Sequence, residues 1–241
     1  MNGKSRSIIR MCGAAVLLAL LAVAGCASQC EKKAVSGDGW LQEFGVEKRT
    51  LSTTGKNRYF VLEPGFQLVL EGEDEKVVVT VLDEIKQIGG IMTRVVEERE
   101  QKNGQLAEVS RNYFAICSDT GDVFYFGEEV DDYKDGKVVS HSGAWLAFEK
   151  GAKPGLIMPG APSVGAKYYQ EIAPGKALDR AEIVSLDETL KTPAGTFTGC
   201  LKTLETSGLS PNEREYKTYA PGIGLIQDQD LLLIRYGFVG K

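Results

Sequence analysis

Few residues of this chain have the types and spacing that catalysis requires. His141 is the only histidine, and it lies within residues 138–142, which are expected to end a strand. An imidazole acting as a general base needs an orienting carboxylate and a nucleophile nearby, and no motif supplies either. The closest match to the hydrolase signature Gly-x-Ser-x-Gly is residues 160–165, which contain one residue too many. We therefore predict a structural role for His141 and no catalytic residues.

Carboxylates are abundant, and three runs concentrate them, at residues 71–75, 97–100 and 128–132. Asp131, Asp135 and Gly136 partly match a calcium-binding loop, but Tyr133 occupies a ligand position and Ser142 stands where the bidentate glutamate belongs. We interpret these runs as solvated loops. A hydrolase with two paired carboxylates stays open as an alternative, because the separation between carboxylates is a three-dimensional quantity.

Cofactor and metal motifs are missing from the sequence. Gly222 and Gly224 begin a glycine-rich pattern, but Gln227 stands where a dinucleotide fingerprint needs its third glycine, so the segment is predicted to form a turn. There is no Cys-x-x-Cys pair and no cluster of cysteine with histidine, which argues against zinc and dithiol redox chemistry. We expect neither a cofactor nor a metal.

The N-terminus has the layout of a secretory signal. Three basic residues precede an uncharged, mostly apolar stretch over residues 12–24, which as a helix would rise only about 20 Å and so fits a membrane span poorly. Residues 23–26, Val-Ala-Gly-Cys, resemble the lipobox of bacterial lipoproteins. That resemblance implies removal of residues 1–25, lipidation of Cys26 with acyl chains such as palmitate, and anchoring to the membrane. Ala27 follows the cysteine, which favours the outer membrane in a two-membrane bacterium.

The overall charge excludes one class of partner. The chain has a net charge of −5. Its first 25 residues contain three basic residues and no acidic residue, so residues 26–241 have a net charge of −8. A nucleic-acid partner is therefore not expected. With 43% hydrophobic and 25% charged residues, the composition is that of an ordinary globular protein.

The cysteines pose one covalent question. With Cys26 lipidated, Cys30, Cys117 and Cys200 remain as thiols in an oxidising compartment. Cys117 and Cys200 lie in strand-like segments, and a disulfide between them would stabilise the fold by about 4 kcal/mol in the chain-entropy model. Two separate buried thiols are an equally good alternative.

The elements that must position these residues are predicted to be antiparallel strands. Apolar runs after residue 57 are short, β-branched or aromatic, and are separated by Gly, Asn, Asp and Pro. We expect strands at residues 66–70, 76–82, 91–100, 106–117, 123–126, 138–148, 167–171, 177–186, 197–204, 213–220, 225–227 and 231–238. Asn103 and Gly104 predict a tight hairpin turn, and the one helical candidate is residues 40–44.

A weak repeat sets the expected architecture. Residues 81–84, Val-Leu-Asp-Glu, recur about 104 residues later as Ser-Leu-Asp-Glu at residues 185–188. We predict a tether over residues 26–56 and a single all-β domain over residues 57–241, with similar meander halves at 57–150 and 160–241. The domain is expected to be a curved sheet or barrel-like, and to surround a cavity or a filled core.

One connection between the halves could control access to a cavity. Residues 151–165 are rich in Gly and Pro but contain the apolar tripeptide Leu156, Ile157 and Met158. Such a tripeptide in a long loop acts either as a lid over a ligand or as a plug for the core.

Three further segments resemble an uncharacterised family of secreted, β-rich bacterial lipoproteins. They are residues 58–65, 95–100 and 219–225, the last reading Tyr-Ala-Pro-Gly-Ile-Gly-Leu, and the resemblance covers most of residues 57–230. These are turn and strand residues, so the resemblance implies a fold and no catalytic residues. In architecture the family is similar to the curved half-barrels of envelope lipoprotein carriers, an analogy that does not settle function.

We expect a lipid-anchored protein of the bacterial cell envelope, facing the periplasm or the surface, that binds a hydrophobic or lipidic ligand without catalysis. An envelope protein that is structural or binds another protein is the second hypothesis. An unrecognised carboxylate hydrolase is the third. Converging carboxylates in a cleft would favour the third, and an apolar cavity would favour the first.

Overall fold

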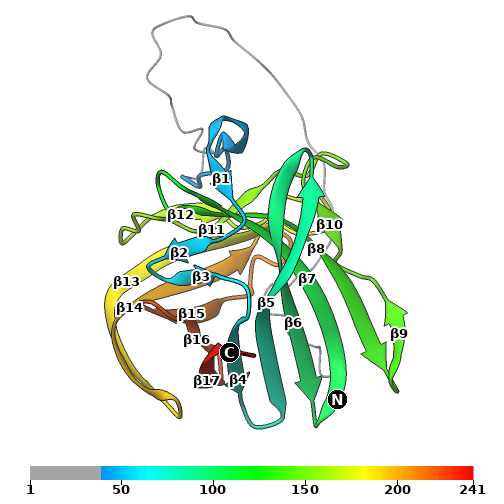
Figure 1. Ribbon diagram of the computed structural model, residues 1–241, viewed down its shortest axis with the longest axis vertical. Coiled ribbons are helices and arrows are strands. Elements are labelled where there is room, and N and C mark those ends of the chain that lie inside the picture. The colour runs from blue at the N-terminus through cyan, green and yellow to red at the C-terminus, as the bar shows by residue number, and fades with distance from the viewer. Residues whose placement is uncertain (1–38, 241) are drawn as a thin grey trace, which may run out of the picture.

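The computed structural model describes residues 39–240, which form an almost entirely β structure (Figure 1). A curved sheet of 15 strands, antiparallel at each strand pair, contains every described strand except a separate hairpin of β2 and β3. This confirms the predicted fold class. The described part of the chain contains a single 3-10 helix, Val46–Lys48, and no helix with the length and apolar character needed to cross a membrane.

The strands match most of the predicted segments. Their bounds are β1 Leu51–Ser52, β2 Gly55–Asn57, β3 Phe60–Leu62, β4 Phe66–Glu71, β5 Glu75–Ile88, β6 Ile91–Lys102, β7 Gln105–Cys117, β8 Val123–Lys134, β9 Lys137–Ser140, β10 Trp145–Leu146, β11 Gly155–Met158, β12 Lys167–Tyr169, β13 Asp179–Thr192, β14 Gly195–Ser207, β15 Glu215–Ala220, β16 Gly224–Asp228 and β17 Leu231–Phe238. Alternating β-branched and aromatic residues form these strands, and the intervening Gly, Asn and Pro residues form the turns.

The large sheet consists of two meanders joined edge to edge. Strands β4 to β8 lie in sequence order on one side, strands β12 to β16 lie in order on the other, and β17 pairs with β4 to join them (Figure 1). Strands β5 and β13 have 14 residues each and begin at residues 75 and 179, while β6 and β14 begin at residues 91 and 195. The repeat of about 104 residues thus falls on corresponding strands of the two meanders.

The predicted hairpin between β6 and β7 is confirmed. Asn103 and Gly104 have φ angles of 50° and 75°, and Lys102 pairs with Gln105 across the turn. Both turn residues need the left-handed conformation that a type I′ turn requires, which Asn and Gly adopt at low cost. The turn at Gly222 is also confirmed, with a φ of 74°.

Two local predictions were wrong. Residues 40–44 are not helical, because the backbone N–H of Leu41 donates to Lys167 O and Leu41 O accepts from Tyr169 N, both at 2.9 Å. Pairing with β12 therefore replaces helical hydrogen bonds. Residues 39–56 also pack on the domain, with Phe44 and Val46 buried and β1 paired to β7, so this part of the predicted tether belongs to the fold.

The strand predicted over residues 138–148 is divided in two. Strands β9 and β10 both pair with β8, but the turn around Gly143, with a φ of 106°, separates them. Strand β8 continues to Lys134, eight residues beyond the predicted end at Phe126, because its second half pairs with both β7 and β9.

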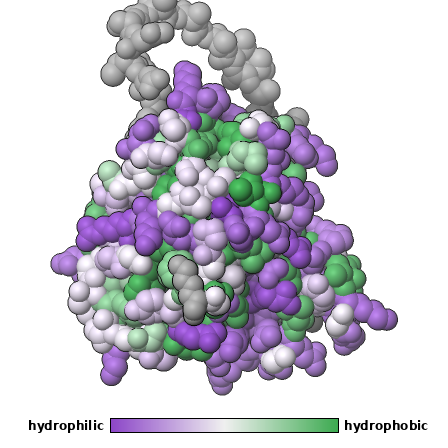
Figure 2. All heavy atoms as spheres, in the orientation of Figure 1, coloured by the Kyte–Doolittle hydropathy of each residue, from purple (hydrophilic) through white to green (hydrophobic). Residues whose placement is uncertain are grey.

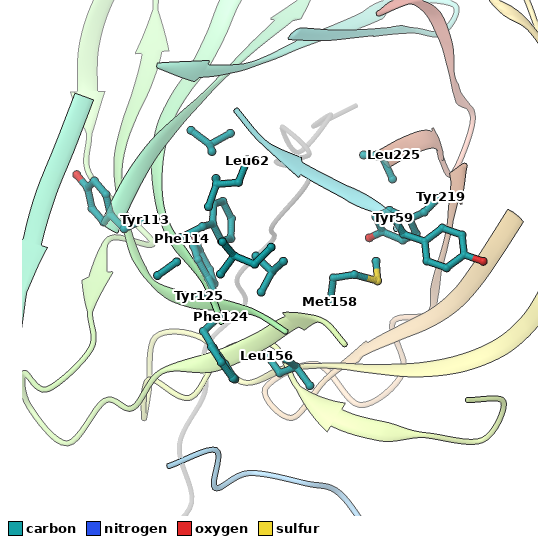
Figure 3. Close-up of a cluster of buried hydrophobic side chains, with 14 of the residues drawn as sticks. Tyr59, Leu62, Tyr113, Phe114, Phe124, Tyr125, Leu156, Met158, Tyr219 and Leu225 are labelled. Carbon is teal, nitrogen blue, oxygen red and sulfur yellow. The ribbon is translucent and has the colours of Figure 1, made fainter. Parts of the chain in front are cut away.

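The core lies on the concave side of the sheet, between the meanders. Figure 3 shows Phe114 and Tyr125 on one side and Tyr59 and Tyr219 on the other, with Met158 projecting between them. The turn of the β2–β3 hairpin joins the two sides, since the Tyr59 hydroxyl donates to Gly199 O at 3.1 Å. The sheet and the core described above are formed by residues 39–240. A protein that starts at residue 31 therefore contains every residue that makes these contacts.

The outer surface is mainly hydrophilic on the face that Figure 2 shows. Hydrophobic residues gather there in small patches and do not form one continuous surface. Most of the large hydrophobic side chains of residues 39–240 are instead buried in the core. The interior is therefore the place to search for a ligand site.

Candidate functional site

A cavity of about 120 Å³ lies on the concave side of the sheet, between the two meanders. One part of its wall is apolar and comes from strands β3 to β7, from β11 and from β16. Six of these side chains are Phe60, Phe66, Leu68, Val79, Phe114 and Leu225. The exposed Glu213 is also among the lining residues, so one end of the cavity reaches solvent.

The other part of the wall is acidic. Among the described lining residues, six are acidic and only Lys217 is basic; the acids are Glu98, Glu171, Asp179, Glu205, Glu213 and Glu215. All except Glu98 come from the second meander or from the segments that flank its strands. Side chains of this kind are rarely buried without a charge partner or a hydrogen bond.

Lys217 neutralises one of these carboxylates. Its Nζ lies 3.0 Å from Glu205 Oε2 and 3.9 Å from Asp228 Oδ2, and all three side chains are nearly buried. Burial alone would lower the pKa of Lys217, but Asp228 and Glu205 raise it well above its ordinary value, so the ammonium stays charged. Glu205 Oε1 also accepts hydrogen bonds from neighbouring side chains, namely Gln170, Thr203 and Tyr219. Glu205 is thus a fully satisfied carboxylate.

Glu171 is buried in a different way. The residue is 0% exposed, and neither carboxylate oxygen has a hydrogen-bond partner within residues 39–240. Burial raises the pKa of Glu171 well above its ordinary value, and the charges of Asp179 and Glu128 raise it further. This carboxyl group is desolvated in a residue that lines the cavity, and its hydrogen-bonding capacity is unused among the described residues.

The backbone holds Glu171 in place from two sides. The N–H groups of Gln170 and Glu171 both donate to Asp179 O, at 2.8 and 3.1 Å. On the opposite side Gly155 lies so close that a Cβ placed there would be 1.9 Å from Gln170 O. Only glycine allows β11 to approach this closely, and that approach helps to seal Glu171 from water.

Two more polar atoms of residues in the cavity wall have no hydrogen-bond partner in the described part of the chain. They are Asp179 Oδ1 and Thr206 Oγ1, which lie on the paired strands β13 and β14. Burial raises the pKa of Asp179 to about 7. With the two oxygens of Glu171, four buried polar atoms of residues in the cavity wall therefore lack a hydrogen bond to any described residue, a situation that is uncommon and calls for an explanation.

The first meander contributes further buried carboxylates. Glu98, Glu100 and Glu128 are each at most 4% exposed, so the interpretation of residues 97–100 and 128–132 as solvated loops was wrong for these three. They lie on β6 and β8, where side chains that alternate along a strand point into the concave side. Burial and then the charges of Glu108 and Glu98 raise the pKa of Glu128 well above its ordinary value. The acidic run at residues 71–75, by contrast, forms the largely exposed turn between β4 and β5.

The predicted lid is part of the sheet. Leu156, Ile157 and Met158 belong to strand β11, which pairs with β8, and Leu156 and Met158 are buried in the core. Only Ile157 lines the cavity. Of the two alternatives, a lid and a core plug, the structure therefore favours the plug, with one residue in the cavity wall, because an apolar strand edge is stabilised by pairing rather than left as a loop.

The remaining predicted residues lie away from the cavity. Cys117 and Cys200 are two separate buried thiols on β7 and β14, which is the second of the two alternatives left open by the sequence. The ring of His141 is exposed and lies 2.9 Å from both Val130 O and Asp131 Oδ1. Cys26 lies outside the described residues. Within residues 39–240 no group of three or more His, Cys, Asp or Glu side chains has an arrangement that could hold a metal ion.

Comparison with known proteins gives no relative for this chain. No protein-family model, curated protein or solved structure matches it. The cavity is therefore interpreted from its own geometry.

The sequence contains a signal for some of these carboxylates. Period-two alternation along β6 puts Glu98 and Glu100 on the same face as Val96, and that face pairs with the valines of β5. No such pattern in the sequence indicates that Glu171 is buried. Its burial depends on the approach of β11, a segment that the sequence places in a loop.

Proposed function

We propose that this protein is a lipid-anchored component of the bacterial cell envelope that binds a hydrophobic or lipidic ligand on the concave side of its sheet, without catalysis. The observation that carries the proposal is the cavity of about 120 Å³ between the meanders, with its apolar wall. An apolar cavity of roughly 150 Å³ in another protein holds a benzene molecule, so this volume suits one ring or a short alkyl segment. The open end near Glu213 allows a longer chain to extend towards solvent.

The anchor in this proposal is the lipid predicted on Cys26. Such an anchor would place the cavity beside the membrane, where apolar molecules are concentrated. The resemblance to secreted β-rich lipoproteins supports the same location.

Binding of 1-octanol to residues 31–241, which lack the predicted lipidation site, tests the proposal. Val79 lines the cavity and is only partly buried, so Val79→Trp should fill the space without disturbing the core. The matched control is Val139→Trp on β9, where Val139 is 60% exposed. We expect saturable binding, measured by ligand-observed NMR, that is lost in Val79→Trp and kept in Val139→Trp. Binding that is absent, or equal in both variants, would overturn the proposal.

A carboxylate hydrolase is the second candidate, and one observation favours it. Glu171 is desolvated and has no partner, whereas Glu205 is paired with Lys217 and fully hydrogen-bonded, and both line the same cavity. A desolvated carboxyl group in the same cavity as a charge-paired one is an arrangement that an acid and a base or nucleophile can use. Hydrolysis of glycosides or esters that is abolished by Glu171→Gln and by Glu205→Gln alike would establish this candidate over simple binding.

A further inference from the structure

The chemistry of the cavity wall is more specific than a general apolar site. The apolar residues and the unpartnered carboxylates occupy different parts of one cavity, so an occupant that matches both must have an apolar part and a polar part. The question is which polar group fits the acidic part. This inference rests on the proposed function and specifies its ligand.

Charge determines the sign of that group. Six acidic residues and one basic residue line the cavity, and the basic one, Lys217, lies 3.0 Å from Glu205. A carboxylate or phosphate headgroup would therefore meet a wall whose one basic residue among those described, Lys217, is already paired with Glu205. A cation placed beside Glu171 would instead favour the ionised form of that carboxyl, which burial and the charges of Asp179 and Glu128 otherwise disfavour.

Hydrogen bonding determines how many donors the group needs. Glu171 and Asp179 line the cavity, and both oxygens of Glu171, which is 0% exposed, and Oδ1 of Asp179 are buried without a hydrogen-bond partner among the described residues. Thr206 Oγ1 is a further acceptor in the same wall. A hydroxyl supplies one donor, whereas an ammonium group supplies three and accepts none. Hydrogen bonds from a charged donor to a carboxylate are also about twice as strong as neutral ones.

We propose that the ligand of this cavity is a cationic amphiphile, an aliphatic amine whose ammonium group is held by Glu171 and Asp179 and whose apolar chain lies against Phe60, Phe114 and Leu225. The ammonium donates to the carboxylate oxygens at the acidic part of the wall. The chain runs along the apolar part, and the remainder extends towards the open end.

Three probes of equal chain length test the proposal on residues 31–241 at pH 7. They are octylamine, 1-octanol and octanoate, titrated by calorimetry with the same Val79→Trp variant as a block. We expect octylamine to bind at least tenfold more tightly than 1-octanol, and octanoate to bind more weakly than both. Glu171→Gln should reduce octylamine binding at least tenfold and leave 1-octanol binding unchanged, because the glutamine keeps the shape of the side chain but loses its charge.

Glu73→Gln is the matched control, since it removes the same charge from the exposed turn between β4 and β5. Asp179→Asn provides a second variant if Glu171→Gln no longer binds 1-octanol and has therefore lost the cavity. Octanoate or 1-octanol binding as tightly as octylamine, or octylamine binding that neither variant weakens, would overturn the amine assignment and leave the apolar cavity intact. Binding of none of the three probes would overturn the proposed function as well.

Discussion

Lys217 is the buried cation on which the charge balance of the acidic wall depends, and Lys217→Met tests that role. The substitution keeps most of the apolar stem and removes the ammonium. It leaves Glu205 and Asp228 buried with neither their 3.0 Å nor their 3.9 Å contact to Lys217 Nζ. Removing one partner of a buried ion pair costs about 3–5 kcal/mol, because the remaining charge is desolvated and uncompensated. Against a typical total stability of about 5–15 kcal/mol, this loss would be large.

The assay is equilibrium unfolding in urea, with the free energy of unfolding obtained by linear extrapolation. The double variant Lys217→Met with Glu205→Gln removes the charge left behind, so its stability should return to within about 2 kcal/mol of the unmodified protein. Lys76→Met is the matched control, because Lys76 forms an ion pair with Glu71 in which both side chains are more than 40% exposed. Such an exposed pair is worth about 0–1 kcal/mol. If Lys217→Met cost no more than Lys76→Met, the interpretation of Lys217 as a buried counter-ion would be refuted.

Three further perturbations test other parts of the structure. Gly155→Ala should lower the free energy of unfolding in urea by at least about 2 kcal/mol, because its Cβ would lie 1.9 Å from Gln170 O. Gly104→Ala is the control and should lower it by only about 1 kcal/mol, because Gly104 has a φ of 75° and nothing lies within 4 Å of the added Cβ. Equal losses of stability would refute the close approach of β11. The free energy of unfolding should fall as pH rises from about 4 to about 7, because burial raises the pKa of Asp179 from 3.8 to about 7 and the folded state therefore holds a proton that the unfolded chain releases. The share of Asp179 is about 4 kcal/mol, and Asp179→Asn should remove that share and leave the slope due to Glu171 and Glu128, whose pKa values burial also raises. Met158→Asp should abolish folding, because it buries a charge at a site that is 0% exposed, and circular dichroism measures this. A variant that still folds would favour the lid hypothesis over the core plug.

The sequence predicts the sheet well because the features that form it are local. Turn residues such as Asn103 and Gly104 and the spacing of β-branched residues act within a few positions of the chain. Twelve strands are expected from these patterns, and only the one over residues 138–148 is divided in the structure. The short strand β11 escapes prediction because its partner, β8, lies about 30 residues away in the sequence.

The candidate site is harder to predict because it depends on contacts between distant segments. Glu98 and Glu128 stand in acidic runs, for which a solvated surface is the ordinary interpretation. Alternation with Val96 along β6 indicates the inward face for Glu98, whereas strand pairing is needed to place Glu128 inside. Glu171 is buried by β11 and is fixed by Asp179, neither of which the sequence relates to it. Of the residues predicted to contact a ligand, Ile157 alone lines the cavity.

Native mass spectrometry of residues 31–241, purified from a bacterial periplasm and followed by lipid extraction, tests the binding proposal most directly. The account predicts a one-to-one adduct of an apolar molecule that carries an amine, present on the unmodified chain and lost from Val79→Trp. A clean mass of the protein alone, with no adduct after incubation with envelope lipids and octylamine, would contradict it and favour an envelope protein whose role is structural or depends on a protein partner.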